Sequence, residues 1–155
     1  MIDEIDRRMI KLLQKDGRLS HADIARQLNI APSTAFRRVK RLLEENIIKI
    51  MAIPEPTRLG YQAMAVICLD VETAKIDDVC AHLAADPNVC FLGTTFGRYD
   101  VFLSVYFTSS DALAEFVKGK LSTIDGVRQV ETFYVAELKK RTFGAITRTG
   151  SLVRP

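Results

Sequence analysis

The chain has 155 residues, of which 48% are hydrophobic and 26% are charged. This is an ordinary globular composition without a run of about eighteen apolar residues, so it excludes an intrinsically disordered chain and a membrane-spanning protein. The first six residues are acidic and lack the apolar core of a signal peptide, which predicts a cytoplasmic protein.

The net charge of +3 is unevenly distributed along the chain. Residues 1–60 contain twelve Lys and Arg against eight Asp and Glu, whereas residues 61–155 contain ten against eleven. The basic excess therefore belongs to the N-terminal part, where it favours a nucleic-acid partner.

The cysteines and histidines show no metal-binding spacing. Cys68, Cys80 and Cys90 are odd in number and include no C-x-x-C pair, and His21 and His82 lie far apart. A zinc site needs close pairs of Cys or His ligands. We therefore expect buried, reduced cysteines, and we expect neither a metal ion nor another cofactor.

The segment Pro32–Glu45 has the pattern of a basic amphipathic helix. Apolar residues recur at every third or fourth position. They are Ala35, Phe36, Val39, Leu42 and Leu43. The cations between them are Arg37, Arg38, Lys40 and Arg41. Such a helix fits the major groove of DNA, although a basic face is more often only a solvated surface.

Two shorter helices are predicted before this segment. Residues 3–16 combine helical apolar spacing with acids in the first turn, and Ser20 begins a second helix that ends near Asn29. A turn of about three residues then leads into the basic helix, as in a helix-turn-helix. The β-branched run Ile47–Ile53 predicts a strand or small wing. The sequence therefore predicts a (winged) helix-turn-helix DNA-binding domain over residues 1–53.

Six side chains of the basic helix are expected to contact DNA. They are Ser33, Thr34, Phe36, Arg37, Arg38 and Arg41. We assign Arg41 to a phosphate, because recognition helices divide their contacts between bases and backbone. Phe36 fits either a thymine methyl group or the protein core.

Three segments resemble the opening module of the Lrp/AsnC family, the feast/famine transcription regulators of bacteria and archaea. They are Ile5–Arg8, Leu12–Arg18 and Arg37–Leu42. The family usually has Ser-Pro at the entry to its recognition helix, whereas this chain has Ala31-Pro32. The missing capping hydroxyl costs about 1 kcal/mol of local stability. The resemblance extends over residues 2–140.

A second domain is predicted after the linker Pro54–Gly60, whose two prolines and one glycine interrupt regular structure and form a stiff hinge. Strand-like and helical runs alternate beyond it. They cover residues 61–71, 76–85, 89–96, 101–107, 111–121 and 127–138. The order is βαββαβ, so we expect an α+β protein with a ferredoxin-like domain over residues 61–138. Residues 139–155 form a basic surface tail, expected to contact a neighbouring subunit or DNA.

The strands of this second domain predict a homodimer. Residues 63–69 and 101–107 are apolar on both sides, whereas two helices cover only one face of the sheet. The other face is most economically buried against the same sheet of a second subunit. A two-fold pair of recognition helices then reads an approximately palindromic site in double-stranded DNA.

The polar turn Gly97–Asp100 lies between two apolar runs, and its residues alone indicate a hairpin turn. The resemblance to Lrp/AsnC regulators implies a further role, because in relatives this loop borders an amino-acid site between dimers. The effector-binding residues that it implies are Gly97, Arg98, Tyr99, Asp100 and Thr132. It also implies assembly into octamers or larger arrays, which an effector shifts by binding one state better.

The sequence therefore predicts a sequence-specific DNA-binding transcriptional regulator that responds to a small effector, with an amino acid implied by the resemblance. We expect no enzyme, because the chain contains no nucleophile elbow, P-loop or H-E-x-x-H motif. The alternative is a ligand-sensing or protein-interaction module without sequence-specific DNA binding. The cations of the basic helix argue against that alternative.

Overall fold

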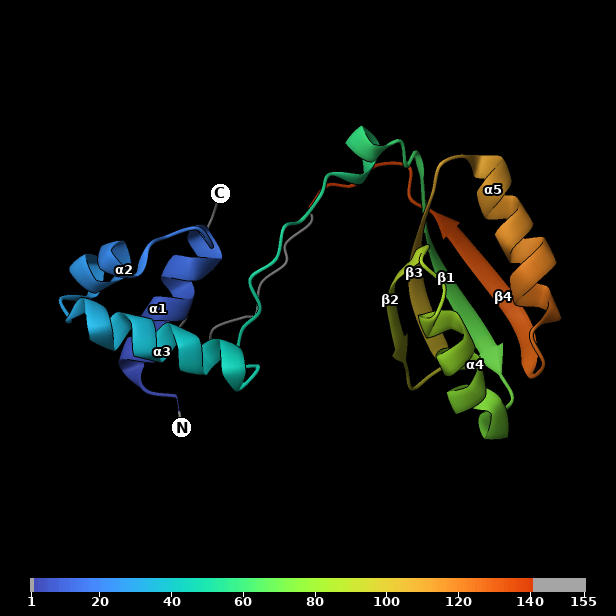
Figure 1. Ribbon diagram of the computed structural model, residues 1–155. Coiled ribbons are helices and arrows are strands. Elements are labelled where there is room, and N and C mark those ends of the chain that lie inside the picture. The colour runs from blue at the N-terminus through green and yellow to red at the C-terminus, as the bar shows by residue number, and fades with distance from the viewer. Residues whose placement is uncertain (1, 141–155) are drawn as a thin grey trace. The chain divides into compact units, whose positions relative to one another are not determined.

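The computed structural model describes residues 2–140, and the chain separates into two compact units. One unit contains the residues up to Ile53, and the other begins at Pro54. Figure 1 shows helices in the first unit and a sheet with helices in the second. Most of the predicted basic tail, residues 141–155, lies outside the described residues.

The N-terminal unit contains the three predicted helices. They are α1 (Glu4–Lys15), α2 (His21–Leu28) and α3 (Pro32–Glu44). Asp3 and Asp6 form a capping box at the start of α1, and Ser20 accepts a hydrogen bond from the Asp23 N–H at the start of α2. Asn29 ends α2 in the left-handed conformation. Short-range capping thus sets the helix-turn-helix boundaries.

One apolar stripe from each helix builds the core of this unit. Its buried residues are Met9, Ile24, Ala25, Leu28, Ala35, Val39 and Leu42. Ile47 and Ile48 pack against the same core, whereas Ile50 and Ile53 are about half exposed. The predicted strand or wing at Ile47–Ile53 is wrong, because residues 48–55 form neither helix nor strand. Among residues 2–53, no other strand lies beside this segment, and an unpaired strand is not stable alone.

The second unit contains a four-stranded antiparallel sheet with the order β2-β3-β1-β4. Its strands are β1 (Ala63–Val71), β2 (Val89–Thr94), β3 (Val101–Phe107) and β4 (Val127–Tyr134). The predicted βαββαβ order and the ferredoxin-like fold are therefore confirmed. β2 and β4 end earlier than predicted. After β2, the Thr95 N–H donates to the Asp100 carbonyl within the loop, and after β4, the Val135 N–H donates to the Met64 carbonyl outside the strand.

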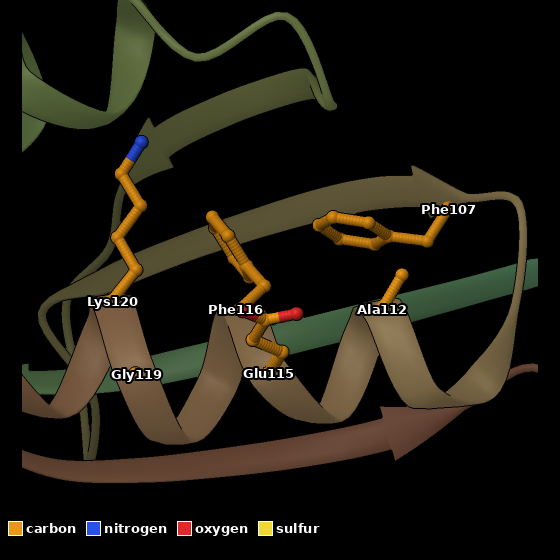
Figure 2. A pocket seen from close by; sticks show the side chains of 6 residues that line it. All are labelled: Phe107, Ala112, Glu115, Phe116, Gly119 and Lys120. Carbon is orange, nitrogen blue, oxygen red and sulfur yellow. The ribbon is translucent and has the colours of Figure 1, made fainter.

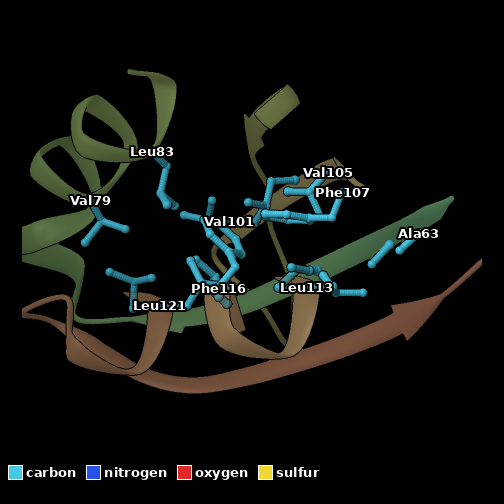
Figure 3. Close-up of a cluster of buried hydrophobic side chains, with 14 residues drawn as sticks. Ala63, Val79, Leu83, Val101, Val105, Phe107, Leu113, Phe116 and Leu121 are labelled. Carbon is cyan, nitrogen blue, oxygen red and sulfur yellow. The ribbon is translucent and has the colours of Figure 1, made fainter. Parts of the chain in front are cut away.

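Helical segments cover one face of this sheet. They are α4 (Ile76–Ala84), α5 (Ser110–Glu115) and the π-helical turn Phe116–Lys120 that continues α5. Short 3-10 turns are η1 (Pro56–Leu59), η2 (Thr73–Lys75) and η4 (Leu121–Thr123). Figure 3 shows alternate strand residues such as Val101 and Val105 packed against Val79, Leu83 and Phe116. This shared core fixes both helices on the same side.

The opposite face of the sheet carries apolar side chains without a covering layer in the described residues. Its half-buried residues on β1 and β3 are Met64, Val66, Cys68, Phe102 and Tyr106. Phe91 and Phe133 on the outer strands are 56% and 49% exposed. We call this surface the open sheet face. Its apolar character agrees with the sequence pattern that predicted a partner subunit.

The expectation that all three cysteines are buried is wrong for Cys90. Cys68 and Cys80 are partly buried, whereas Cys90 is exposed. The register shift between Val89 and Phe91 turns Cys90 outward, so that its Sγ lies 3.0 Å from the Ser104 Oγ. A β-bulge redirects a side chain in this way, and sequence pattern alone does not reveal it.

Candidate nucleic-acid interface and effector loop

The first turns of α3 present polar side chains to solvent. Pro32 occupies the first turn, and the N-cap residue Ala31 makes no side-chain capping bond. Ser33 and Arg37 are exposed, and Thr34 is partly buried. Free N–H groups at a helix N-terminus attract phosphate oxygens, and residues four apart share one helix face. Three of the predicted DNA-contact residues are thus placed around the exposed start of α3.

Phe36 lies outside the core and is 53% exposed. Its ring packs edge-to-face on His21, the first residue of α2, with 5.2 Å between the ring centroids. The alternative that Phe36 belongs to the core is therefore wrong, and His21 is likewise exposed. The pair fixes the direction of an apolar side chain on the recognition-helix surface.

Two other predicted DNA contacts, Arg38 and Arg41, turn toward α1. Arg38 Nη1 lies 2.6 Å from Asp3 Oδ2 and 2.9 Å from Asp6 Oδ1. Arg41 Nη2 donates to Asp6 Oδ2. Asp6 is completely buried, whereas the side chains of Arg38 and Arg41 remain 23% and 38% exposed. We call these four residues the Asp6 cluster: Asp3, Asp6, Arg38 and Arg41.

Hydrogen bonds and neighbouring charges favour the charged forms of Asp3 and Arg38. The Asp6 N–H, followed by the Arg38 guanidinium, lowers the pKa of Asp3 below its usual value. Hydrogen bonds to Asp3 and then to Asp6 raise the pKa of Arg38. Opposite charges at hydrogen-bond distance stabilise each other in this way.

The remaining two cations of α3 differ in their partners. Lys40 Nζ lies 3.6 Å from Glu44 Oε1 in an i,i+4 pair on the surface. Among residues 2–140, the structure shows no acidic partner for Arg37. Arg37 is therefore the α3 cation most available to a bound anion.

Asp6 is the residue that the sequence analysis missed, since it was interpreted only as a first-turn acid. One signal was present in the pattern. Asp6 precedes Met9 by three positions and Ile10 by four, so it lies on the apolar face of α1. An acid on an apolar face is rarely buried unless it is paired. The pairing partner, more than thirty residues away, is visible only in the fold.

The loop between β2 and β3 has the geometry of a tight hairpin. The Thr95 N–H donates to the Asp100 carbonyl at 2.8 Å, and the Asp100 N–H donates to the Leu69 carbonyl at 2.9 Å. Asp100 Oδ2 accepts a hydrogen bond from the Val71 N–H at 2.8 Å. Gly97 has φ +144°, a conformation that favours glycine. The predicted turn is confirmed, and the Asp100 carboxylate attaches it to the end of β1.

Tyr99 extends from this loop past β1 to β4, the edge strand on the far side of the sheet. Its hydroxyl group donates to Glu131 Oε2 on β4, and the Arg98 guanidinium lies 5.2 Å from the centroid of its ring. Thr132 follows Glu131 on β4, so its side chain points to the other face, which it shares with its cross-strand partner Ile67. Within one chain, the structure therefore groups Arg98, Tyr99 and Asp100 but does not bring Thr132 to them.

Two hollows lie elsewhere on the second unit. One of about 460 Å³ lies beside α5 and is lined by Phe107, Ala112, Glu115, Phe116, Gly119 and Lys120 (Figure 2). Lys120 Nζ is held there by Asp86 Oδ2 at 2.5 Å. The other, of about 180 Å³, lies between η1 and the segment that follows β4. Neither hollow contains a predicted DNA-contact or effector residue.

The part of the chain that the structure describes contains no group of three or more His, Cys, Asp or Glu side chains arranged for a metal ion. No helix in residues 2–140 is long and apolar enough to cross a membrane.

Sequence comparison identifies both halves of the chain. Residues 2–49 match the family model described as winged helix-turn-helix DNA-binding. Residues 64–144 match the model of the Lrp/AsnC ligand binding domain, which covers more than half of the chain. The chain belongs to the Lrp/AsnC family of transcriptional regulators. Its first unit is the family's DNA-binding module, although the structure shows no wing strand in residues 48–55.

Relatives of this Lrp/AsnC protein match over most of their length. An HTH-type transcriptional regulator of Pyrococcus abyssi is 40% identical over 140 residues, which cover 90% of this chain and 89% of the relative. The HTH-type transcriptional regulator FL11 of Pyrococcus furiosus is 32% identical over 92% of this chain and 94% of its own.

Solved structures share the fold. Escherichia coli AsnC has a TM-score of 0.83 and 29% identity, and the match covers 92% of this chain and 98% of AsnC. A transcriptional regulator of Neisseria meningitidis, solved as a complex with L-Met, has a TM-score of 0.88 and 24% identity. That match covers 94% of this chain and 97% of the other.

Proposed function

We propose that the protein is a sequence-specific DNA-binding regulator of transcription in the cytoplasm, without a catalytic role, whose DNA binding responds to an amino acid. The observation that carries this proposal is the exposed start of α3, with Ser33, Phe36 and Arg37 on its surface, in a DNA-binding module joined to a ligand-binding domain. The L-Met complex of the Neisseria meningitidis relative supports an amino acid as the effector class.

The proposed DNA contacts follow from where the side chains lie. We expect Ser33, Thr34 and Arg37, which lie near the N-terminus of α3, to meet base edges and phosphates. Phe36 projects beside them and suits the methyl group of a thymine. The contribution of Arg38 and Arg41 to DNA binding depends on their ion pairs with Asp3 and Asp6 in the Asp6 cluster.

The proposed active form is a homodimer that buries the open sheet face, and dimers assemble further into octamers or larger arrays. Half-buried apolar residues such as Val66 and Phe102 form the centre of this face. An apolar sheet face rimmed by polar residues is typical of a subunit interface. Pairing two copies places two recognition helices on one duplex, which favours a pseudo-palindromic operator.

Selection of bound duplexes from a random DNA pool tests this function directly. We expect wild-type protein at moderate salt to enrich a pseudo-palindrome, and Arg37→Ala to weaken its binding by about tenfold, because a good arginine contact is worth about 1–3 kcal/mol. Lys118→Ala removes an exposed cation of the second unit and serves as the control. Failure of the wild type to enrich any sequence contradicts the proposal and favours a ligand-sensing module without specific DNA binding.

The same selection with and without mixed amino acids tests the effector loop. The proposed effector residues are Gly97, Arg98, Tyr99, Asp100 and Thr132, and the last requires a neighbouring subunit to complete the site.

Tyr99→Phe removes the hydroxyl that donates to Glu131 and thereby loosens the loop. We expect the amino-acid concentration for a half-maximal response to rise about tenfold, since a hydrogen bond to a charged group contributes about 1.5–3 kcal/mol. Titration of operator binding by fluorescence anisotropy measures this concentration. The matched control is Tyr134→Phe, because the Tyr134 hydroxyl that it removes donates to the Gln62 carbonyl at 3.4 Å. If Tyr99→Phe and wild type need the same amino-acid concentration for a half-maximal response, the proposed role of this loop in effector binding is contradicted.

A further inference from the structure

The cations of α3 do not have the same freedom to meet DNA. Arg38 and Arg41 both bond to the buried Asp6, Lys40 pairs with Glu44 on the surface, and Arg37 has no acidic partner in residues 2–140. The sequence presents four equivalent positive charges. The fold divides them into a paired set and a free one.

Asp6 engages the two arginines with different oxygen atoms. Oδ1 accepts from Arg38 Nη1 at 2.9 Å, and Oδ2 accepts both from Arg41 Nη2 and from the Asp3 N–H at 3.1 Å. Asp3 in turn accepts from the Asp6 N–H and from Arg38. The capping box of α1 is thus bonded directly to α3. Because Arg38 and Arg41 are three residues apart, this double attachment restricts rotation of α3 about its own axis.

The charge balance of the Asp6 cluster is neutral, with two carboxylates and two guanidinium groups. Asp6 is completely buried, so neither water nor salt screens it effectively. The Nε atom of Arg41 is buried as well. A DNA phosphate therefore competes with a buried carboxylate already at bonding distance. Moving both arginines to phosphates would leave the Asp6 charge buried and unpaired, which is strongly unfavourable.

We propose that Asp6 is a positioning residue for DNA recognition, which holds Arg38 and Arg41 away from phosphates and fixes the angle at which α3 presents Arg37 and Phe36. This inference rests on the proposed function, since it assigns roles within DNA binding. It makes Arg37 the α3 arginine that neutralises a phosphate. Arg38 and Arg41 act through orientation of the helix.

Salt dependence separates these roles, because each neutralised phosphate adds about 0.9 to the slope of log K against log salt concentration. The enriched duplex is titrated at a series of KCl concentrations with Arg37→Gln, Arg38→Gln and Arg41→Gln. We expect Arg37→Gln to reduce the slope by about 0.9 for each phosphate that it no longer neutralises, or about 2 in a dimer. Arg38→Gln and Arg41→Gln are expected to retain the wild-type slope while affinity falls. Slopes reduced equally by all three variants overturn the inference.

Asp6→Asn provides an independent test, because it keeps the side-chain shape and removes the charge that holds the arginines. We expect its slope to become steeper than that of the wild type as the arginines reach phosphates. Its preference for the enriched duplex over unrelated DNA is expected to fall about tenfold. Asp23→Asn is the control, since Asp23 is the corresponding first-turn acid of α2 and pairs with Arg26. An unchanged slope and preference in a folded Asp6→Asn protein overturn the inference.

These outcomes remain distinct from failure of the proposed function. If the wild type enriches no duplex, DNA recognition itself is contradicted and the role of Asp6 falls with it. If a duplex is enriched and the three arginine variants behave alike, only the role of Asp6 is contradicted. If Asp6→Asn does not fold, the slopes of Arg37→Gln and Arg41→Gln still decide the inference.

Discussion

Val66→Glu is expected to convert the protein into a monomer and to lower its affinity for a two-half-site duplex by about 100-fold or more. Val66 lies in the central strand β1, between Ser104 on β3 and Phe133 on β4, at the middle of the open sheet face. When two sheets meet, a carboxylate at this position is buried without a partner. The free energy needed to remove its charge from water exceeds the stabilisation from the apolar contacts around it. The affinity falls because linked half-site contacts gain about 10²–10⁴ over single ones.

Sedimentation equilibrium and operator titration measure the two effects on the same preparation. The matched control is Ala114→Glu, which places the same carboxylate on the exposed side of α5, on the opposite layer of the domain. Unchanged far-UV circular dichroism shows that each variant is folded. A Val66→Glu protein that remains dimeric would assign the subunit interface to another surface.

The order of helices and strands was predictable because local chemistry determines it. Ser20 and its Asp23 partner mark the start of α2, and the apolar run of β3 begins at Val101 directly after the Asp100 turn. Those signals lie within a few residues of the boundary that they set. The wing was predicted from β-branched residues alone, and a strand also requires a partner strand, which residues 48–55 do not have within residues 2–140.

The details of the candidate site depended on contacts that sequence spacing does not contain. The pairing of Arg38 and Arg41 with Asp6 spans more than thirty residues, so the basic helix was predicted with more free charge than it has. The apolar spacing of the basic helix included Phe36, but the buried stripe of α3 does not, since the ring of Phe36 packs on His21 at the surface. The π-helical turn after α5, which the sequence did not predict, begins at Phe116, a residue buried in the same core as Leu121. Tertiary context decides such features.

Asp6→Ala is expected to lower the free energy of unfolding of the helix-turn-helix unit by about 3 kcal/mol. The change removes the carboxylate that both arginines of the cluster share, and it leaves the Asp3 N–H without its side-chain acceptor. Breaking a buried ion pair by deleting one partner typically costs about 3–5 kcal/mol. We expect the lower end of this range, because the partly exposed arginines can turn to water after the carboxylate is removed. Urea unfolding followed by circular dichroism of the helices measures this decrease.

Glu4→Ala decides whether the decrease reflects pairing or the helix dipole. Glu4 is also an acid in the first turn of α1, but it is exposed. An acid that acts only on the helix dipole contributes about 0.3–1 kcal/mol, so Glu4→Ala is expected to lower the stability by no more than that. Equal decreases in the free energy of unfolding of the two variants would mean that Asp6 acts only on the helix dipole, as Glu4 does. A decrease confined to Asp6→Ala means that α1 and α3 are joined through this carboxylate, which is buried behind the exposed predicted DNA-contact residues of α3.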